Sequence, residues 1–308
     1  MLNPSLLSLI CTVMTVVLPL ADSSAAKPAP ELPRTPDLAD THYGPEKMQV
    51  FDLWKAKSDQ PCPLVVRIHG GGFVSGSKGV TAETVNSYLQ QGISFMDISY
   101  RLTPEVALPT HHLDCARAVQ FARASAKEWN IDPKRIAATG SSAGGCSALW
   151  LAFHDDLADP RSADPILRES TRLTCAFVHS AQTSLDPRVV KEWIGDVVMT
   201  HPAWKNPALW GLKPDEFNTP KACALQEACS PIAHLTRDDP PVWMAYGIPK
   251  EPLTLSSAIH HRNYGLRLKE QMDKLGIECV ILIGHAKRGE EETPFPFLLK
   301  QFGMKPAK

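Results

Sequence analysis

The chain has 308 residues, of which 44% are hydrophobic, and this is enough to form the core of one large domain or two small ones. Its 32 Lys and Arg residues nearly cancel its 33 Asp and Glu residues, and it has no dense basic run. This balance argues against nucleic acid or an anionic membrane surface as a partner and favours a small or neutral molecule. Because no CxxC or HExxH spacing occurs, we also expect no metal site.

The first 26 residues predict a secretory signal peptide. Residues 6–20 are almost entirely apolar but short for a membrane span, and the small residues that follow suit cleavage after Ala26. No Lys or Arg precedes the apolar run, so an uncleaved anchor is the alternative. Residues 27–42 are Pro-rich and predict an extended tether. We therefore expect a secreted or periplasmic protein with no stable membrane insertion after cleavage.

Residues 43–308 predict one α/β domain. Short apolar runs alternate there with segments of helical periodicity, which favours a mostly parallel central sheet with helices on both faces. Residues 186–230 break this alternation with several prolines and with Trp193, Trp204 and Trp210. The interval falls between the sixth and seventh core strands, and it predicts either a small helical cap over the site or a packed surface insertion.

A serine lies at the centre of a glycine-flanked turn. Residues 140–144 read GSSAG, with a strand-like run before them and an Ala-rich helical run after them. This pattern is typical of a turn in which the central residue takes strained backbone angles and the glycines on either side avoid a collision. The spacing selects Ser142 as a nucleophile and turns the amide of Ala143 toward the same point. Taken alone, the pattern fits an ordinary Gly/Ser turn equally well.

A second glycine motif follows an earlier strand. Residues 69–72 read HGGG, and backbone without side chains can turn its amides toward an oxygen that becomes negatively charged. Gly71 and Gly72 are the expected donors, each worth roughly 3 to 4 kcal/mol of barrier in a dry site. A phosphate-binding loop is excluded, because Lys78 is displaced from the position that such a loop requires.

Together these motifs resemble the α/β-hydrolase fold, in the branch of hormone-sensitive-lipase-like carboxylesterases and the related BD-FAE-like feruloyl and acetyl-xylan esterases. The resemblance continues through residues 100–119, YRLTPEVALPTHHLDCARAV. It implies a structural role for Asp114 and for His69. The branch usually carries an acid where this chain has Ser141, a position that is not part of the catalytic triad.

The resemblance also implies a histidine base after the last strand. His285 stands there, after the apolar run 279–283. An imidazole at this strand end can take the proton of Ser142 and return it to the leaving alcohol. The pair His260 and His261 is the alternative, for which we favour a capping or surface role.

The acid of the triad is less well defined. Where the resemblance places an aspartate after the penultimate strand, this chain has Lys250. Glu251 is the first candidate and Asp186, which follows the preceding strand, is the second. A chain without a triad acid is the third possibility.

These residues predict a secreted carboxylic ester hydrolase that needs no cofactor and acts on a small acyl or aryl ester, carbohydrate-linked esters included. The alternative is a catalytically lapsed α/β-hydrolase that binds a ligand or partner in the old cleft. It is favoured by Lys250 and by the charged residues that follow His285. The intact glycine turns favour the enzyme, since strained turns cost stability.

Overall fold

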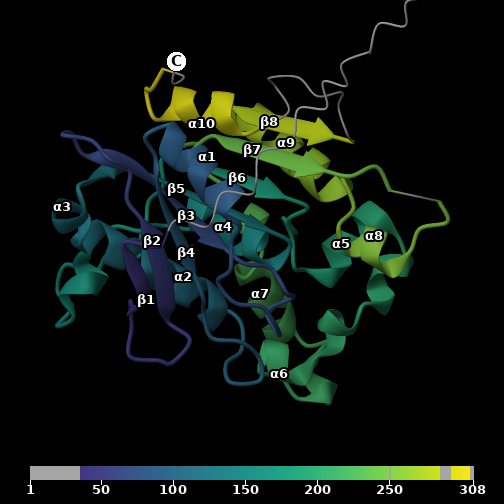
Figure 1. The fold of residues 1–308 in the computed structure, drawn as a ribbon. Coiled ribbons are helices and arrows are strands. Elements are labelled where there is room, and N and C mark those ends of the chain that lie inside the picture. Colours follow the sequence, from purple (N-terminus) through teal and green to yellow (C-terminus); the bar gives the residue numbers. More distant parts are fainter. Residues whose placement is uncertain (1–34, 250, 285–292, 306–308) are drawn as a thin grey trace, which may run out of the picture. The chain divides into compact units, whose positions relative to one another are not determined.

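The computed structural model describes residues 35–249, 251–284 and 293–305. Eight strands form one sheet in the order β1-β2-β4-β3-β5-β6-β7-β8 (Figure 1). β1 pairs with β2, and β2 with β4, in antiparallel orientation, whereas all the other neighbouring strands are parallel. The predicted mostly parallel sheet is therefore confirmed. The strands are β1 (Leu38–His42), β2 (Val50–Trp54), β3 (Cys62–Ile68), β4 (Ser94–Ile98), β5 (Ile131–Ser141), β6 (Cys175–His179), β7 (Val242–Tyr246) and β8 (Cys279–Ile283).

Helices cover both faces of this sheet (Figure 1). Successive strand residues point to opposite faces, so Val65 packs in one hydrophobic cluster while Leu64 and Val66 pack in the other. The first cluster includes residues of α1 (Ala82–Gln90) and α10 (Phe295–Gln301). The second includes residues of α2 (Thr110–Ala124), α4 (Ala143–Phe153) and α9 (Asn263–Leu275). The shorter helices are α3 (Ala126–Trp129), α5 (Pro187–Ile194), α6 (Pro207–Trp210), α7 (Pro220–Ala228) and α8 (Leu255–Ile259).

The sheet begins earlier than the sequence predicted. Residues 38–42, assigned to the tether, form β1, in which Leu38 lies opposite Leu53 of β2. An edge strand has one partner and a largely exposed surface, so it lacks the apolar run that marks a central strand. The predicted signal peptide and the first part of the tether lie outside the described residues. Among the residues that are described, no helix is long and apolar enough to cross a membrane.

The insertion, residues 186–230, connects β6 to β7 and packs around its own tryptophans. It contains α5, α6, α7 and single turns of 3₁₀ helix, among them η2 (Val197–Thr200) and η3 (Pro202–Lys205). Trp204 and Trp210 are buried. The indole N–H of Trp204 donates to the Val198 carbonyl at 2.6 Å, and that of Trp210 donates to the Ala203 carbonyl at 2.8 Å. The prolines begin these short helices and the indoles hold them together.

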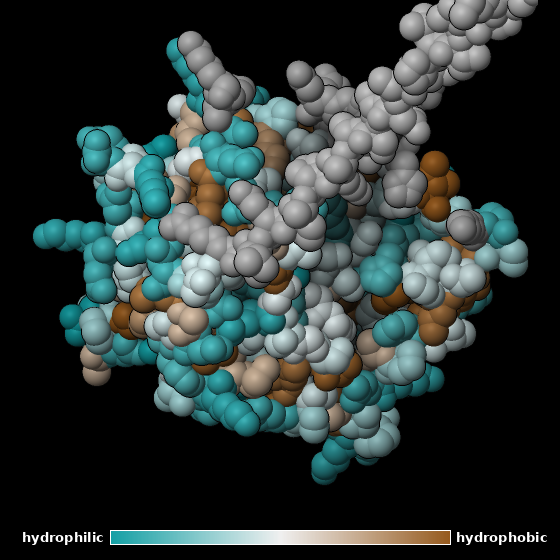
Figure 2. Space-filling model, viewed as in Figure 1, coloured by the Kyte–Doolittle hydropathy of each residue, from teal (hydrophilic) through white to brown (hydrophobic). Residues whose placement is uncertain are grey.

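The surface seen in Figure 2 is mainly hydrophilic, with hydrophobic residues in small separate patches. Several of these patches lie over the region of α5, α6 and α8 in the same view.

Two histidines are buried at the beginning of α2. His111 and His112 are fully buried, and Nδ1 of His112 lies 3.0 Å from Oγ of Ser147. The His112 ring also stacks on Trp150, with ring centroids 5.0 Å apart. Burial lowers the pKa of His111 to about 4 and that of His112 to about 3.

We expect this burial to make the free energy of unfolding fall as the pH drops below about 6.5. The unfolded chain can protonate both imidazoles there, whereas the folded chain keeps them neutral until about pH 4 for His111 and about pH 3 for His112. Each histidine adds up to about 1.4 kcal/mol per pH unit in this window. Urea denaturation at several pH values measures the slope. His112→Phe, which removes one titrating group, should make the slope shallower, and an unchanged slope would contradict the assignment.

Candidate active site

Ser142 lies at the junction of β5 and α4, in a turn that requires glycine on both sides. Its backbone has φ 53° and ψ −125°, a conformation that a residue with a side chain rarely adopts. A Cβ at Gly144 would lie 2.1 Å from the carbonyl oxygen of Ile68, and one at Gly140 would lie 2.5 Å from the backbone of Gly144. The turn therefore places Ser142 directly after β5, and it packs closely against the end of β3.

The glycine loop after β3 passes beside this serine. A Cβ on Gly70 would lie 3.5 Å from Cβ of Ser142, so the two turns are in close contact. Gly71 and Gly72 have φ of +108° and +61°, which favour glycine. In the described part of the chain, the amides of Gly71, Gly72 and Ala143 donate to no backbone carbonyl. All three residues line the same cavity as Ser142.

Two residues of the family pattern brace this loop. The His69 ring stacks on Tyr100, with centroids 4.3 Å apart, and the Tyr100 hydroxyl donates to the His69 carbonyl at 3.0 Å. The buried Asp114 carboxylate accepts from the backbone amide of Arg101 at 3.0 Å and from its guanidinium Nε at 2.9 Å. Arg101 thereby ties the segment after β4 to α2, and Tyr100 ties the same segment to the start of the glycine loop.

His260 is the imidazole that the structure brings to Ser142. Its Nε2 lies 2.9 Å from Oγ of Ser142, and its Nδ1 lies 2.9 Å from the carbonyl oxygen of Ser256. Because a carbonyl oxygen can only accept, Nδ1 carries the proton and Nε2 is left to accept from the serine hydroxyl. This is the arrangement that a general base needs. The expected capping role is confirmed, since His260 is the C-cap residue of α8 and its Nδ1–H donates to a carbonyl of that helix. The contact with Ser142 is an additional role that was not expected.

The segment that carries His260 is held by several side chains. His260 directly follows α8, and the buried Gln182 donates through Nε2 to the carbonyl of Ile259 at 2.6 Å. At the other end of α8, the hydroxyl of Thr254 accepts from the amide of Ser257 at 3.2 Å, and Oγ of Ser257 accepts from the amide of Thr254 at 2.9 Å. Both ends of this short helix are thereby fixed, which restricts the position of the imidazole.

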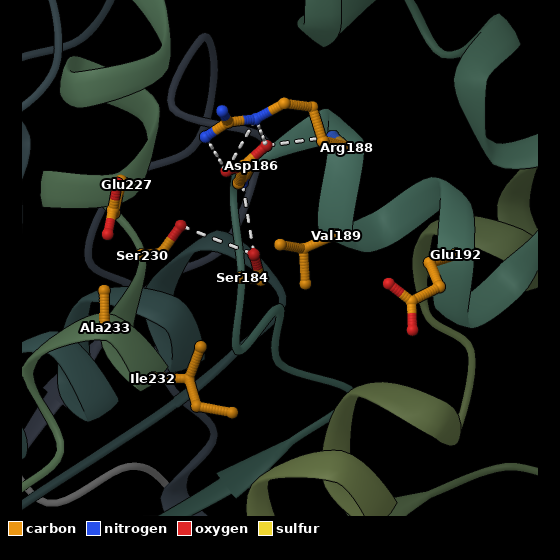
Figure 3. Close-up of a pocket in the computed structure, with 9 residues that line it drawn as sticks. All are labelled: Ser184, Asp186, Arg188, Val189, Glu192, Glu227, Ser230, Ile232 and Ala233. Atoms are coloured by element: carbon orange, nitrogen blue, oxygen red, sulfur yellow. Dashed lines mark hydrogen bonds and ion pairs between the residues drawn. The ribbon is translucent and has the colours of Figure 1, made fainter.

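The predicted base, His285, lies outside the described residues, as does Lys250. Asp186 lies inside, but it has a different set of partners (Figure 3). Its carboxylate accepts from the backbone amide of Arg188 at 2.9 Å, capping α5, and from Nε of Arg188 at 2.9 Å. Burial raises the pKa of Asp186, but its bonds with Arg188 outweigh burial and leave the pKa below the usual range.

Asp186 borders a separate cavity of about 500 Å³, which it lines together with Glu192, Glu227, Ser184 and Ser230 and with apolar residues such as Val189 and Ile232 (Figure 3). It is absent from the lining of the Ser142 cavity. The structure therefore assigns Asp186 to helix capping and does not bring it to the serine.

Glu251, the other predicted acid, is exposed. Its charge acts on the neighbouring His261, whose pKa is lowered by burial and by Arg262 and is raised in part by Glu251. Among the described residues, no carboxylate is a hydrogen-bond partner of His260, and the Ser256 carbonyl occupies its Nδ1. Asp186 is thus a helix cap and Glu251 is a surface residue. Their pairing with His285 stays a prediction, because His285 lies outside the described residues.

The cavity around Ser142 and His260 has a volume of about 750 Å³ and walls that are mainly apolar. One wall consists of the glycine loop with Phe73 and Val74, and another comes from the insertion, residues 201–210. Its apolar and aromatic lining comprises Phe73, Val74, Leu108, Leu185, Trp204, Leu209, Trp210 and Ile259. A volume of this size accommodates a small organic molecule.

The strand order, the strained serine after the fifth strand and the imidazole on its hydroxyl together define an α/β-hydrolase. The sequence model of the BD-FAE family matches residues 51–255, and the chain belongs to this family. The matched range contains the glycine loop and the serine turn.

Curated relatives with similar sequences are named esterases. The probable carboxylic ester hydrolase LipM of Mycobacterium tuberculosis is 26% identical over 68% of this chain and 47% of its own length. Esterase LipC of the same organism is 36% identical over 33% of this chain and 26% of its own length. The chain thus spans half or less of the length of these relatives.

Solved structures share the fold. An acetyl ester-xyloside bifunctional hydrolase from Caldicellulosiruptor lactoaceticus superposes with a TM-score of 0.61, at 23% identity, over 82% of this chain and 83% of that chain. The esterase Est2 of Thermogutta terrifontis superposes with a TM-score of 0.60, at 19% identity, over 85% and 91% of the two chains. At these identities the similarity establishes the common architecture.

Proposed function

We propose that this protein is a carboxylic ester hydrolase in which Ser142 is the nucleophile and His260 is the base. The observation that carries the proposal is the 2.9 Å contact between Oγ of Ser142 and Nε2 of His260. The cavity around them is lined by Gly71, Gly72 and Ala143, whose amides have no backbone acceptor among the described residues. The names of the curated relatives support the same class of reaction.

The chemistry follows from this geometry. Nε2 of His260 takes the hydroxyl proton while Oγ of Ser142 forms a bond to the ester carbonyl carbon. The carbonyl oxygen becomes negatively charged and accepts hydrogen bonds from the amides of Gly71, Gly72 and Ala143. When the tetrahedral intermediate collapses, the bond to the alcohol oxygen breaks and Nε2–H protonates that oxygen. A water molecule, deprotonated by His260, then releases the acid and regenerates the serine.

The orienting group of this base is a backbone carbonyl. The carbonyl of Ser256 fixes Nδ1–H as a carboxylate does, but it carries a dipole instead of a full charge, so it stabilises the imidazolium less. The proposed machinery is therefore a Ser–His pair with a carbonyl in the place of the acid.

The apolar lining supports a small acyl or aryl ester as substrate. Carbohydrate-linked esters belong to the same proposal, because a structural neighbour is named as a hydrolase of an acetyl ester and a xyloside. Secretion is also part of the proposal, and it is supported by the leader-like pattern of residues 1–26.

Hydrolysis of p-nitrophenyl acetate and butyrate tests the activity. The protein should turn over both esters, and Ser142→Ala should lower kcat by about 10⁴-fold or more, because water alone must then attack. Circular dichroism would establish that the variant is folded. If the unmodified protein were as slow as Ser142→Ala on these and on acetyl-sugar and feruloyl esters, the lapsed-hydrolase alternative would replace the enzyme.

The two predicted acids should not be needed for turnover. Asp186→Ala and Glu251→Ala are expected to keep kcat for p-nitrophenyl butyrate within about threefold, whereas loss of a triad acid costs about 10⁴-fold. Asp186→Ala should also lower the free energy of unfolding by about 1 kcal/mol, through loss of the α5 cap. A fall in kcat of a hundredfold or more in either folded variant would show that its carboxylate reaches the base.

A further inference from the structure

His201 places a second imidazole in the wall of the cavity that contains Ser142. It comes from the insertion, between η2 and η3, and it lines the cavity together with His260. The Ser–His chemistry proposed above assigns no task to this residue. The insertion wall is otherwise mainly apolar, with Trp204 and Trp210 among its residues. Asn206 is the other polar residue of this wall, and its Oδ1 accepts from the backbone amide of Ala208 at 3.1 Å.

The hydrogen bonds of His201 show which of its nitrogens is free. Its Nδ1 accepts from the backbone amide of Ala203 at 3.2 Å, and His201 is thereby the cap of η3. A nitrogen that accepts carries no proton, so in the neutral ring the proton is on Nε2. In the described part of the chain, Nε2 of His201 has no hydrogen-bond partner. The ring of this cavity-lining residue therefore has one N–H with no protein acceptor among the described residues.

The ring is held in the neutral state. Burial lowers the pKa of His201, and the nearby His260 lowers it further. When a ligand displaces water from a neutral N–H in an apolar wall, an oxygen on the ligand replaces the hydrogen bond to water. A plain hydrocarbon removes that hydrogen bond and offers no acceptor in its place.

We propose that His201 is a substrate-binding residue that donates a hydrogen bond from Nε2 to an oxygen on the part of the substrate that occupies the cavity. This inference rests on the proposed esterase function and narrows its substrate class. The preferred esters then carry an ether or hydroxyl oxygen in the acyl or alcohol chain, in addition to the two oxygens of the ester group. A simple alkyl or aryl ester has only carbon at that position.

Matched pairs of esters test this class. One pair varies the acyl side, p-nitrophenyl 3-methoxypropanoate against p-nitrophenyl pentanoate, in which an ether oxygen replaces a methylene. The second pair varies the alcohol side, 2-methoxyethyl butyrate against butyl butyrate. The unmodified protein should favour the oxygenated member of one pair in kcat/KM by about fivefold, the ratio expected of one neutral hydrogen bond. The pair that responds identifies which side of the ester occupies the cavity.

Two variants separate substrate binding from a structural role. His201→Leu removes both the N–H and the cap of η3, whereas His201→Ser keeps a side chain that caps well but has no imidazole N–H. In both variants, the kcat/KM of the oxygenated ester divided by that of its hydrocarbon partner should fall to about 1. If neither pair is discriminated by the unmodified protein, or if His201→Ser keeps the preference that His201→Leu loses, the inference is overturned. This test compares only ratios between esters, so its failure is distinct from failure of the proposed esterase function. If the His201 inference is overturned, turnover of p-nitrophenyl acetate that depends on Ser142 would still support the esterase.

Discussion

His260→Ala is expected to lower kcat for p-nitrophenyl butyrate by about 10⁴-fold or more, while His285→Ala stays within about tenfold of the unmodified protein. The reason is the position of the proton acceptor. Nε2 of His260 lies 2.9 Å from Oγ of Ser142, and the Ser256 carbonyl holds the ring in the tautomer that can accept. Without it, the serine hydroxyl keeps its proton and attacks poorly.

The pair of variants distinguishes the two candidate bases directly. Both histidines are replaced by the same residue and assayed with the same ester, and circular dichroism with thermal melting confirms that each variant is folded. A large loss of kcat in His285→Ala with near-normal kcat in His260→Ala would show that the base is His285, after the last strand.

Gly144→Ala should be among the most destabilising single-methyl changes in this protein. The added Cβ would lie 2.1 Å from the Ile68 carbonyl and 2.5 Å from that of His69, and both are backbone atoms that cannot move aside alone. We expect the free energy of unfolding to fall by about 3 kcal/mol or more, with loss of activity in whatever remains folded. Urea denaturation, or the yield of soluble folded protein where that is too low, measures the effect.

Gly247→Ala is the matched control for this change. Gly247 also follows a strand at the same end of the sheet, but a Cβ built there meets no atom of the described residues within 4 Å and its φ is not positive. The free energy of unfolding of the Gly247→Ala variant should differ from that of the unmodified protein by less than about 1 kcal/mol. Equal stability of the two variants would show that the close contact between the serine turn and β3 is absent.

The sheet and the two glycine motifs were predictable because each depends on a local pattern. Apolar runs mark the buried parallel strands, and GSSAG can only be read as a turn around Ser142 once a strand precedes it and a helix follows it. The edge strand β1 was missed, since a strand with one partner and an exposed surface has no apolar run.

The partners of Ser142 were harder to predict because they depend on tertiary structure. His260 directly follows a five-residue helix, α8, and nothing in its local sequence indicates that Gln182 anchors that helix beside the serine. The group on Nδ1 is the backbone carbonyl of Ser256, and a carbonyl is present in every residue. The family resemblance implies an acidic side chain, and for this role the sequence offers Glu251 and Asp186. The feature of the sequence that could have indicated the contact of His260 with Ser142 is the His260–His261 pair, placed shortly before a long helix.

Covalent labelling tests the central claim most directly. The protein, His260→Ala and Ser142→Ala would each be incubated with a fluorophosphonate, which reacts with a serine only when a base activates its hydroxyl, and the adduct would be mapped by peptide mass spectrometry. The Ser–His pair predicts one adduct on Ser142 in the unmodified protein, labelling slowed by orders of magnitude in His260→Ala, and none in Ser142→Ala. An adduct on another residue, or labelling of Ser142 at an unchanged rate in His260→Ala, would contradict it.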